Sequence, residues 1–148
     1  MAFHFSLEAV LRMWKGRESF ERLRLEAITA KILRLRSEIE SVEQASLKDR
    51  RNVTATLSDG MAASQLQFVA LCTEGQRRFR DLMQKQVAEL MRLHEAQRKV
   101  FEHARRQRET LQNLRDRKFD TYRIEETRRA QQQMDELFLA RRNSTPNE

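Results

Sequence analysis

The chain has 148 residues, of which 29 are Lys or Arg and 22 are Asp or Glu, so its net charge is +7. Charged residues make up 34% of the chain and hydrophobic residues 39%, whereas an ordinary soluble domain has about 25% and 45–50%. The chain is therefore rich in surface and poor in core. Three glycines and one proline are too few for a turn-rich β fold or for glycine-rich phosphate-binding loops.

The residues that usually carry chemistry are few and scattered. Cys72 is the single cysteine, which excludes an internal disulfide and a cysteine metal cluster. His4, His94 and His103 have neither metal-ligand nor catalytic-triad spacing. We expect no catalytic residues, no metal and no cofactor. We also find no secretory signal pattern and no apolar stretch of membrane-spanning length, so we expect a cytoplasmic protein.

Apolar residues in the first third of the chain recur at alternating steps of three and four. This heptad pattern is typical of a helix that packs along one stripe. Glu18 and Glu21 occupy two positions of the stripe and interrupt it. The pattern predicts a helix over about 6–57. Its apolar members are Leu7, Leu11, Trp14, Leu25, Ile28, Ile32, Leu35, Ile39 and Val42.

A second stripe predicts another helix, over about 76–141, followed by a disordered tail at 143–148. Three glutamines share this stripe, and polar stripe positions predict modest stability. The phase slips by about one residue after Leu114, which changes the supercoil without ending the helix. The members are Phe79, Met83, Gln86, Leu90, Leu93, Gln97, Val100, Ala104, Gln107, Leu111 and Leu114, then Phe119, Tyr122, Ala130 and Leu137, with Met134 beside the stripe.

The segment between the two stripes has a different composition. Residues 52–76 contain no Lys or Arg, although basic residues are dense on both sides. Gly60 follows a Ser-Asp pair, which is typical of a helix end. Thr73 and Gln76 have the spacing of a capping box that starts a helix. By contrast, residues 76–142 carry 18 basic and 11 acidic residues, a net charge of +7.

These signals predict an all-α fold, a long antiparallel two-helix coiled-coil hairpin that forms a single domain over residues 1–142. A tight turn at Gly60 would leave more than twenty residues of amphipathic helix without a partner. We therefore predict a broad tip over about 58–75, with a short helical piece at about 61–71. The alternative is one long helix that dimerises in parallel, against which the glycines and capping signals argue.

Two surfaces are candidates for partner binding. Apolar tip residues either pack among themselves or form an exposed patch, which usually marks a partner surface; they include Leu57, Met61, Leu66, Phe68 and Val69. The opposite end is expected to gather apolar residues from both termini, namely Phe3, Phe5, Leu7, Met134, Leu137 and Phe138.

The two ends of the chain together resemble a known family. The opening Phe3-x-Phe5-x-Leu7-Glu8-x-Val10-Leu11 is similar to the start of FliJ, the flagellar type III export protein. The closing Arg123-x-Glu125-Glu126-x-Arg128-Arg129-x-Gln131-x-x-x-Asp135-Glu136 is similar to the last helix of that family. Length, heptads and basic charge agree, so the resemblance covers essentially the whole chain. The middle of the chain departs from the family pattern.

The resemblance implies a non-enzymatic, stalk-like coiled coil at the cytoplasmic face of the inner membrane, at the flagellar base. FliJ-like proteins insert into the ring of the export ATPase FliI, contact the export gate protein FlhA and interact with export chaperones. We assign the ring-facing end to Phe3, Phe5, Leu7, Arg128, Arg129, Met134 and Leu137. The tip partner surface is inferred from the charge gap and consists of Leu57, Met61, Leu66, Phe68 and Val69.

Two other functions compete with this hypothesis. One is a structural coiled-coil scaffold, or the equivalent stalk protein of a virulence type III secretion system. The other is a basic coiled coil that binds nucleic acid or an anionic membrane, with binding that collapses at high salt. Arg residues are interspersed with Glu and Gln along both predicted helices. We therefore expect no nucleic-acid partner, and membrane contact only indirectly through the export apparatus.

Overall fold

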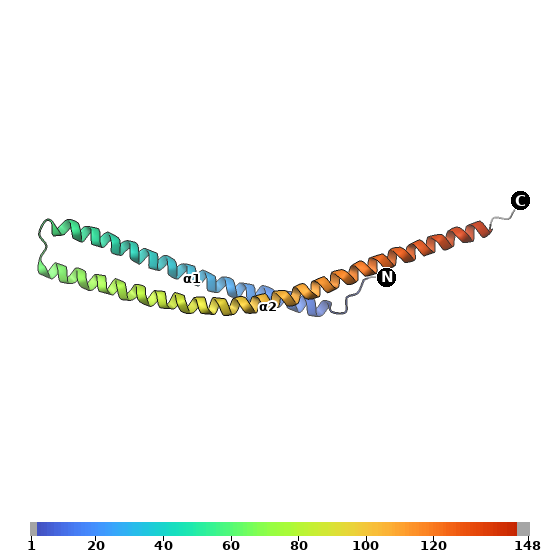
Figure 1. Cartoon of the computed structure of the whole chain (residues 1–148), viewed down its shortest axis with the longest axis horizontal. Helices are drawn as coiled ribbons and strands as arrows, with labels where there is room; N and C mark the ends of the chain where they lie inside the picture. Colours follow the sequence, from blue (N-terminus) through green and yellow to red (C-terminus); the bar gives the residue numbers. More distant parts are fainter. Residues whose placement is uncertain (1–2, 145–148) are drawn as a thin grey trace. The chain divides into compact units, whose positions relative to one another are not determined.

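A computed structural model describes residues 3–144 of the chain, and the side chains of residues 3–142. Nearly all of this part is helical, in α1 (Glu8–Leu57) and α2 (Ala63–Ser144) (Figure 1). No strand occurs within residues 3–144. The predicted all-α antiparallel two-helix hairpin is confirmed. Of the predicted tail at 143–148, the last four residues lie outside the described range, and α2 continues to Ser144.

The chain forms two compact units, and each contains a stretch of α1 packed against a stretch of α2. The first, which we call the turn unit, comprises residues 19–102. The second, the terminal unit, comprises the first 18 residues together with those from His103 onward. Within the turn unit the helices are antiparallel, because Asp49 contacts Gln76 whereas Glu21 contacts Gln97.

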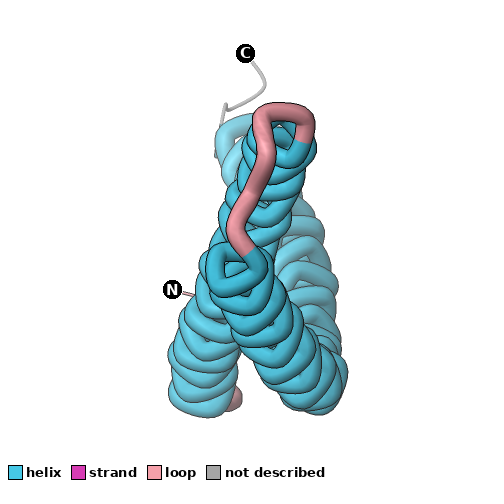
Figure 2. The backbone as a smooth tube through the Cα atoms, turned by 90° about the vertical axis from the view of Figure 1, so that its left-hand side faces the viewer, coloured by secondary structure: helices cyan, strands magenta, loops and turns pink. Residues whose placement is uncertain are grey.

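A short turn of residues 58–62 joins the two helices (Figures 1 and 2). Gly60 lies within it at a φ of 90°, a left-handed conformation that only glycine adopts without strain. The Gly60 N–H donates to the carbonyl of Leu57 at 3.4 Å and closes the end of α1. At the start of α2 the Ala62 N–H donates to Gln65 Oε1 at 3.1 Å, which satisfies a helix-terminal donor.

The broad tip predicted over 58–75, with a short helix at 61–71, is therefore wrong. α2 begins at Ala63 and runs through Gly75. The Thr73 hydroxyl donates to the Val69 carbonyl at 2.9 Å, within the helix, and so does not cap a helix start. The prediction assumed that both stripes are paired to their ends. The tight turn instead leaves the end of α2 without an α1 segment beside it.

Replacing Gly75 with Ala is expected to stabilise the protein by about 1 kcal/mol, because a glycine inside a helix costs about that much relative to alanine. A Cβ built at Gly75 meets no heavy atom within 4 Å, so the methyl group fits. Chemical denaturation followed by circular dichroism measures the effect. Gly60→Ala is the control and should destabilise, because its φ of 90° strains any other residue. Destabilisation by Gly75→Ala would mean that a helix starts near residue 76.

The stripe of α1 packs as predicted, but the stripe of α2 is rotated. Ile32 is 7% exposed, and Met83 and Val87 on α2 are similarly buried. At every seventh residue of α2, the residue predicted to pack against α1 does so. At the stripe positions in between, the packed residue is the one that follows the predicted residue. The correct positions are 83, 90, 97, 104 and 111. The exposed ones are 79, 86, 93, 100, 107 and 114, whereas 80, 87, 94, 101, 108 and 115 are half-buried or buried.

Polar side chains explain the rotation. Arg80, His94, Arg108 and Arg115 hold packed positions on α2, and arginine can bury its aliphatic stem while its charged head reaches a partner. Arg108 and Arg115 each pair with a glutamate of α1. Such pairing across the helices cannot be read from the apolar spacing of α2 alone, which favours Phe79, Leu93, Val100 and Leu114.

Candidate functional site

In the terminal unit, the segment before α1 is packed onto α2. The Phe3 ring meets the Phe119 ring edge-on, with centroids 5.2 Å apart, and lies 5.7 Å from the Tyr122 ring. Phe5 is 4% exposed. Desolvation of Tyr122, with its hydrogen bond to Glu126, raises the pKa of the phenol. Phe3 and Phe5 therefore hold the chain end against α2.

Two ion pairs join the helices of the terminal unit. Arg108 donates two hydrogen bonds to the Glu18 carboxylate, at 2.7 and 3.1 Å, and this contact raises the pKa of the guanidinium. Arg115 Nε donates to Glu8 Oε2 at 3.1 Å. The two-bond geometry of the Arg108–Glu18 pair is the strong form of an arginine–carboxylate contact. Glu18, which interrupts the apolar stripe of α1, thus serves as a specific contact to α2.

Packed side chains also lie near these ion pairs in the terminal unit. Leu11 is fully buried at 0% exposure and Ala104 is 1% exposed. Trp14 packs edge-on against His103, with ring centroids 5.9 Å apart. These contacts fix the register between the start of α1 and the middle of α2.

Beyond this core lies a bare helix, residues 123–142 of α2, which we call the C-terminal extension (Figure 1). Every residue of the C-terminal extension is exposed. Its large apolar side chains include Met134 and Phe138, each 68% exposed, Ile124 at 67% and Leu137 at 59%. Soluble proteins seldom expose a row of large apolar side chains without a partner surface, so the extension is the foremost candidate site.

The structure separates residues that were expected to cluster. Phe3 contacts Phe119 and Tyr122, but Met134 lies twelve residues farther along α2, about 18 Å at the rise of an α-helix. The predicted cluster of both termini is therefore wrong. It splits into a packed group (Phe3, Phe5, Leu7) and an exposed group (Arg128, Arg129, Met134, Leu137, Phe138).

The turn unit carries a second apolar surface. Leu57, Leu66 and Phe68 are 48%, 41% and 68% exposed, and Leu71 is 73% exposed. Met61 and Val69 are half-buried. The sequence left open whether the predicted tip residues pack among themselves or form an exposed patch, and most of them are exposed. They lie on the end of α1, on the turn and on the first turns of α2 instead of on a separate tip helix.

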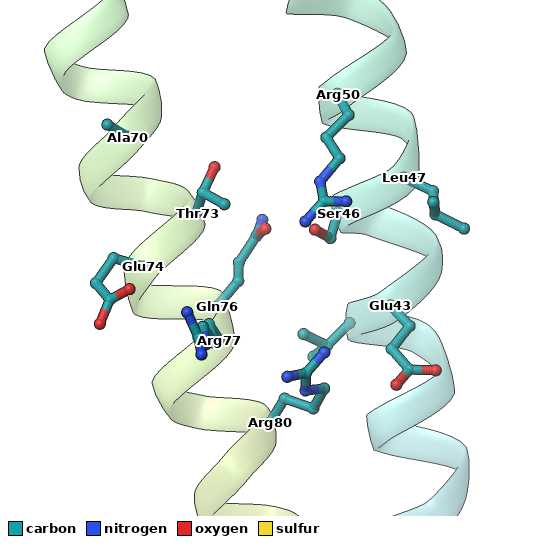
Figure 3. A pocket seen from close by; sticks show the side chains of 11 residues that line it. Glu43, Ser46, Leu47, Arg50, Ala70, Thr73, Glu74, Gln76, Arg77 and Arg80 are labelled. Carbon is teal, nitrogen blue, oxygen red and sulfur yellow. The ribbon is translucent and has the colours of Figure 1, made fainter.

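A groove lies between α1 and α2 near the turn, with a volume of about 750 Å³ (Figure 3). Arg50 of α1 and Arg77 and Arg80 of α2 line it, together with Glu43 and Glu74. Arg80 Nε is buried without a hydrogen-bond partner. Apolar spacing does not reveal this groove, because it depends on the register set by the turn. Its open, mixed-charge lining suits a side-chain contact better than an enclosed ligand.

Metal-binding groups and membrane-spanning helices are absent from the described part of the chain. No group of three or more His, Cys, Asp or Glu residues within it could hold a metal ion. Cys72 is exposed and unpaired with another cysteine. Among the described helices, none is apolar over the length that a membrane crossing requires.

A family model described as "Flagellar FliJ protein" matches residues 3–146, nearly the whole chain. No curated protein and no solved structure matches.

Proposed function

Because the chain belongs to the FliJ family of flagellar export proteins, we propose that it is a non-enzymatic, stalk-like coiled coil of the flagellar type III export apparatus. In this proposal it links the export ATPase ring, FliI, with the export gate, FlhA, and with export chaperones. The observation that carries the proposal is the match over residues 3–146. A helical hairpin with two separate exposed apolar surfaces is consistent with a linker between two partners.

We assign contact with the ATPase ring to the C-terminal extension. Met134 and Leu137 supply exposed apolar area, and Arg128 and Arg129 lie beside them in sequence. Arg129 is loosely paired with Glu125, at 3.9 Å with both side chains exposed, so a partner carboxylate can replace that contact at little cost. Phe3, Phe5 and Leu7 contribute indirectly, by holding the chain end against α2.

We assign the gate or chaperone contact to the surface near the turn. Leu57, Leu66 and Phe68 are exposed there, and Met61 and Val69 add half-buried area. The segment lacks basic residues from 52 to 76, so its contacts should depend little on salt. The family match favours the flagellar system over a virulence secretion system or a general scaffold. The site of action that follows is the cytoplasmic face of the inner membrane.

Replacing Met134 and Leu137 together with Asp is expected to lower affinity for the export ATPase by about tenfold or more, since each lost apolar contact is worth roughly 1–2 kcal/mol. Folding should be unchanged because both side chains are exposed. Co-purification with the ATPase and swarming on soft agar measure the effect.

Phe68→Asp is the matched control for this experiment, an exposed apolar residue of the same helix. It should leave ATPase binding intact and weaken binding to the gate protein or the chaperones. Equal loss of ATPase binding in both variants would contradict the assignment of the two surfaces.

A further inference from the structure

We propose that the groove lined by Arg50, Arg77 and Arg80 binds a carboxylate side chain of the protein that docks on the surface near the turn. The inference rests on the proposed function only for the choice of partner, the export gate or a chaperone. The groove lies within the turn unit, between the last part of α1 and the first part of α2. Its volume of about 750 Å³ is more than one side chain requires, so a partner's side chain can enter.

The two helix segments that border the groove carry an excess of positive charge. Residues 48–51 and 77–80 together contain six basic residues and one acidic residue. The acidic one, Asp49, accepts a hydrogen bond from Gln76 at 2.9 Å, which shows that the two segments lie side by side. Bringing basic residues of both helices together creates a positive local potential, which attracts an anionic group.

The acidic residues of the groove leave its interior positive. Glu74 accepts a hydrogen bond from Arg78 Nε at 2.9 Å, so its charge is already paired. In Figure 3 the carboxylates of Glu43 and Glu74 point away from the space between the helices. Arg50 and Arg80 instead extend into that space from opposite helices. A carboxylate that enters the groove therefore meets hydrogen-bond donors and no facing carboxylate.

The groove arginines have donors to spare. Within the part of the chain that the structure describes, neither Arg50 nor Arg77 forms an ion pair or a side-chain hydrogen bond. Arg80 pairs with Asp81, its neighbour on α2, at 3.1 Å, and its Nε is buried without a hydrogen-bond partner. A buried donor without an acceptor costs free energy. Rotation of the Arg80 side chain toward an incoming carboxylate would supply that acceptor.

The apolar residues near the turn favour a protein over a membrane as the source of the carboxylate. Leu57 is seven residues beyond Arg50, about 10 Å along α1, and Phe68 is nine residues before Arg77, about 14 Å along α2. A protein that covers these exposed side chains thus reaches the groove as well. An anionic membrane is flat at this scale and would leave the groove unfilled. Arginine also holds a carboxylate through two parallel hydrogen bonds, which fixes the position of the partner.

Salt should separate the two kinds of contact at this surface. The apolar contacts of residues 52–76 depend little on ionic strength, because this segment has no basic residue. The contact between arginine and carboxylate weakens as dissolved ions screen it. Affinity for the partner is therefore expected to fall with added salt and then to level off at the value that the apolar contacts provide.

Isothermal titration calorimetry with the cytoplasmic domain of the gate protein and with the export chaperones tests the proposal. The groove variant, Arg50→Glu with Arg77→Glu, should bind its partner about tenfold more weakly or worse, because carboxylates then face the partner's carboxylate. The matched control is Lys31→Glu with Arg106→Glu. It also replaces one exposed basic residue on each helix, changes the net charge equally and leaves the groove intact. It should bind like the wild type, and circular dichroism should show both variants folded.

A fluorescein-labelled poly-glutamate peptide separates this inference from the proposed function. The peptide should bind the wild type and the control variant alike, and the groove variant about tenfold more weakly. If it does so while neither the gate protein nor a chaperone binds the wild type, the proposed function is wrong and the carboxylate site stands.

Two results would overturn the carboxylate site. One is a gate protein or chaperone that binds the groove variant as tightly as the control variant, which would leave the proposed function intact. The other is wild-type binding to phosphatidylglycerol vesicles that is lost in the groove variant, without binding to the peptide or to either protein. The groove would then serve an anionic membrane.

Discussion

Replacing Leu11 with Ala is expected to lower the free energy of unfolding by about 3 kcal/mol, the middle of the range for a buried leucine. Leu11 is 0% exposed and lies in a core of very few residues, so the cavity has little surrounding structure that could collapse into it. Urea denaturation followed by circular dichroism measures the loss. Because marginal stability is general among domains, this one substitution should also shorten the lifetime of the protein in cells.

Leu23→Ala provides the matched control. It makes the same chemical change in the same helix, but Leu23 is 60% exposed, and exposed substitutions usually change stability by less than about 0.5 kcal/mol. A comparable loss for both variants would contradict the α1 stripe described above. It would show that Leu23, and not only Leu11, is covered by another part of the molecule.

Replacing Gln97 with Leu is expected to lower the free energy of unfolding by about 2 kcal/mol, because it leaves a buried carboxylate without its main partner. Glu21 is 6% exposed, and Gln97 Nε2 donates to its Oε2 at 2.6 Å and to its carbonyl at 3.2 Å. Arg24 remains, but at 3.8 Å and with an exposed side chain. Thermal and urea unfolding measure the loss.

Adding Glu21→Leu to Gln97→Leu should recover the loss and exceed wild-type stability, since an apolar pair of similar size often outperforms a buried polar one. Gln107→Leu, a change at an exposed position of the same helix, is the control and should have little effect. A double variant no more stable than the single one would show that Glu21 is solvated. The register of the helices would then need a different explanation.

Much of α1 could be predicted from its spacing. Nine apolar residues from Leu7 to Val42 keep one phase, and this phase survives in the packed helix, with Leu11 and Ile32 buried. Glu18 and Glu21 stand out as interruptions of this spacing, but the spacing does not reveal their partners. They meet Arg108 and Gln97 of α2, and those partners are identifiable only when the position of the turn is known.

Of the two candidate surfaces, only the one near the turn could be predicted from the sequence. The exposed residues near the turn could be found from the charge gap between 52 and 76. The predicted cluster of both termini is wrong, because it assumed that the start of α1 lies beside the end of α2. Phe3 instead meets Phe119 and Tyr122, and residues 123–142 remain exposed.

Amino-acid periodicity dictates that this chain is helical and which face of α1 is buried, and the helix-end signal at Gly60 between the two stripes favours an antiparallel hairpin. These properties depend on steps of three and four along one segment, which are local. The place of the turn, the rotation of α2 and the bare C-terminal extension depend on the tertiary structure. They follow from contacts between distant residues, such as Glu18 with Arg108, whose energies outweigh the local signals at Thr73 and Gly75.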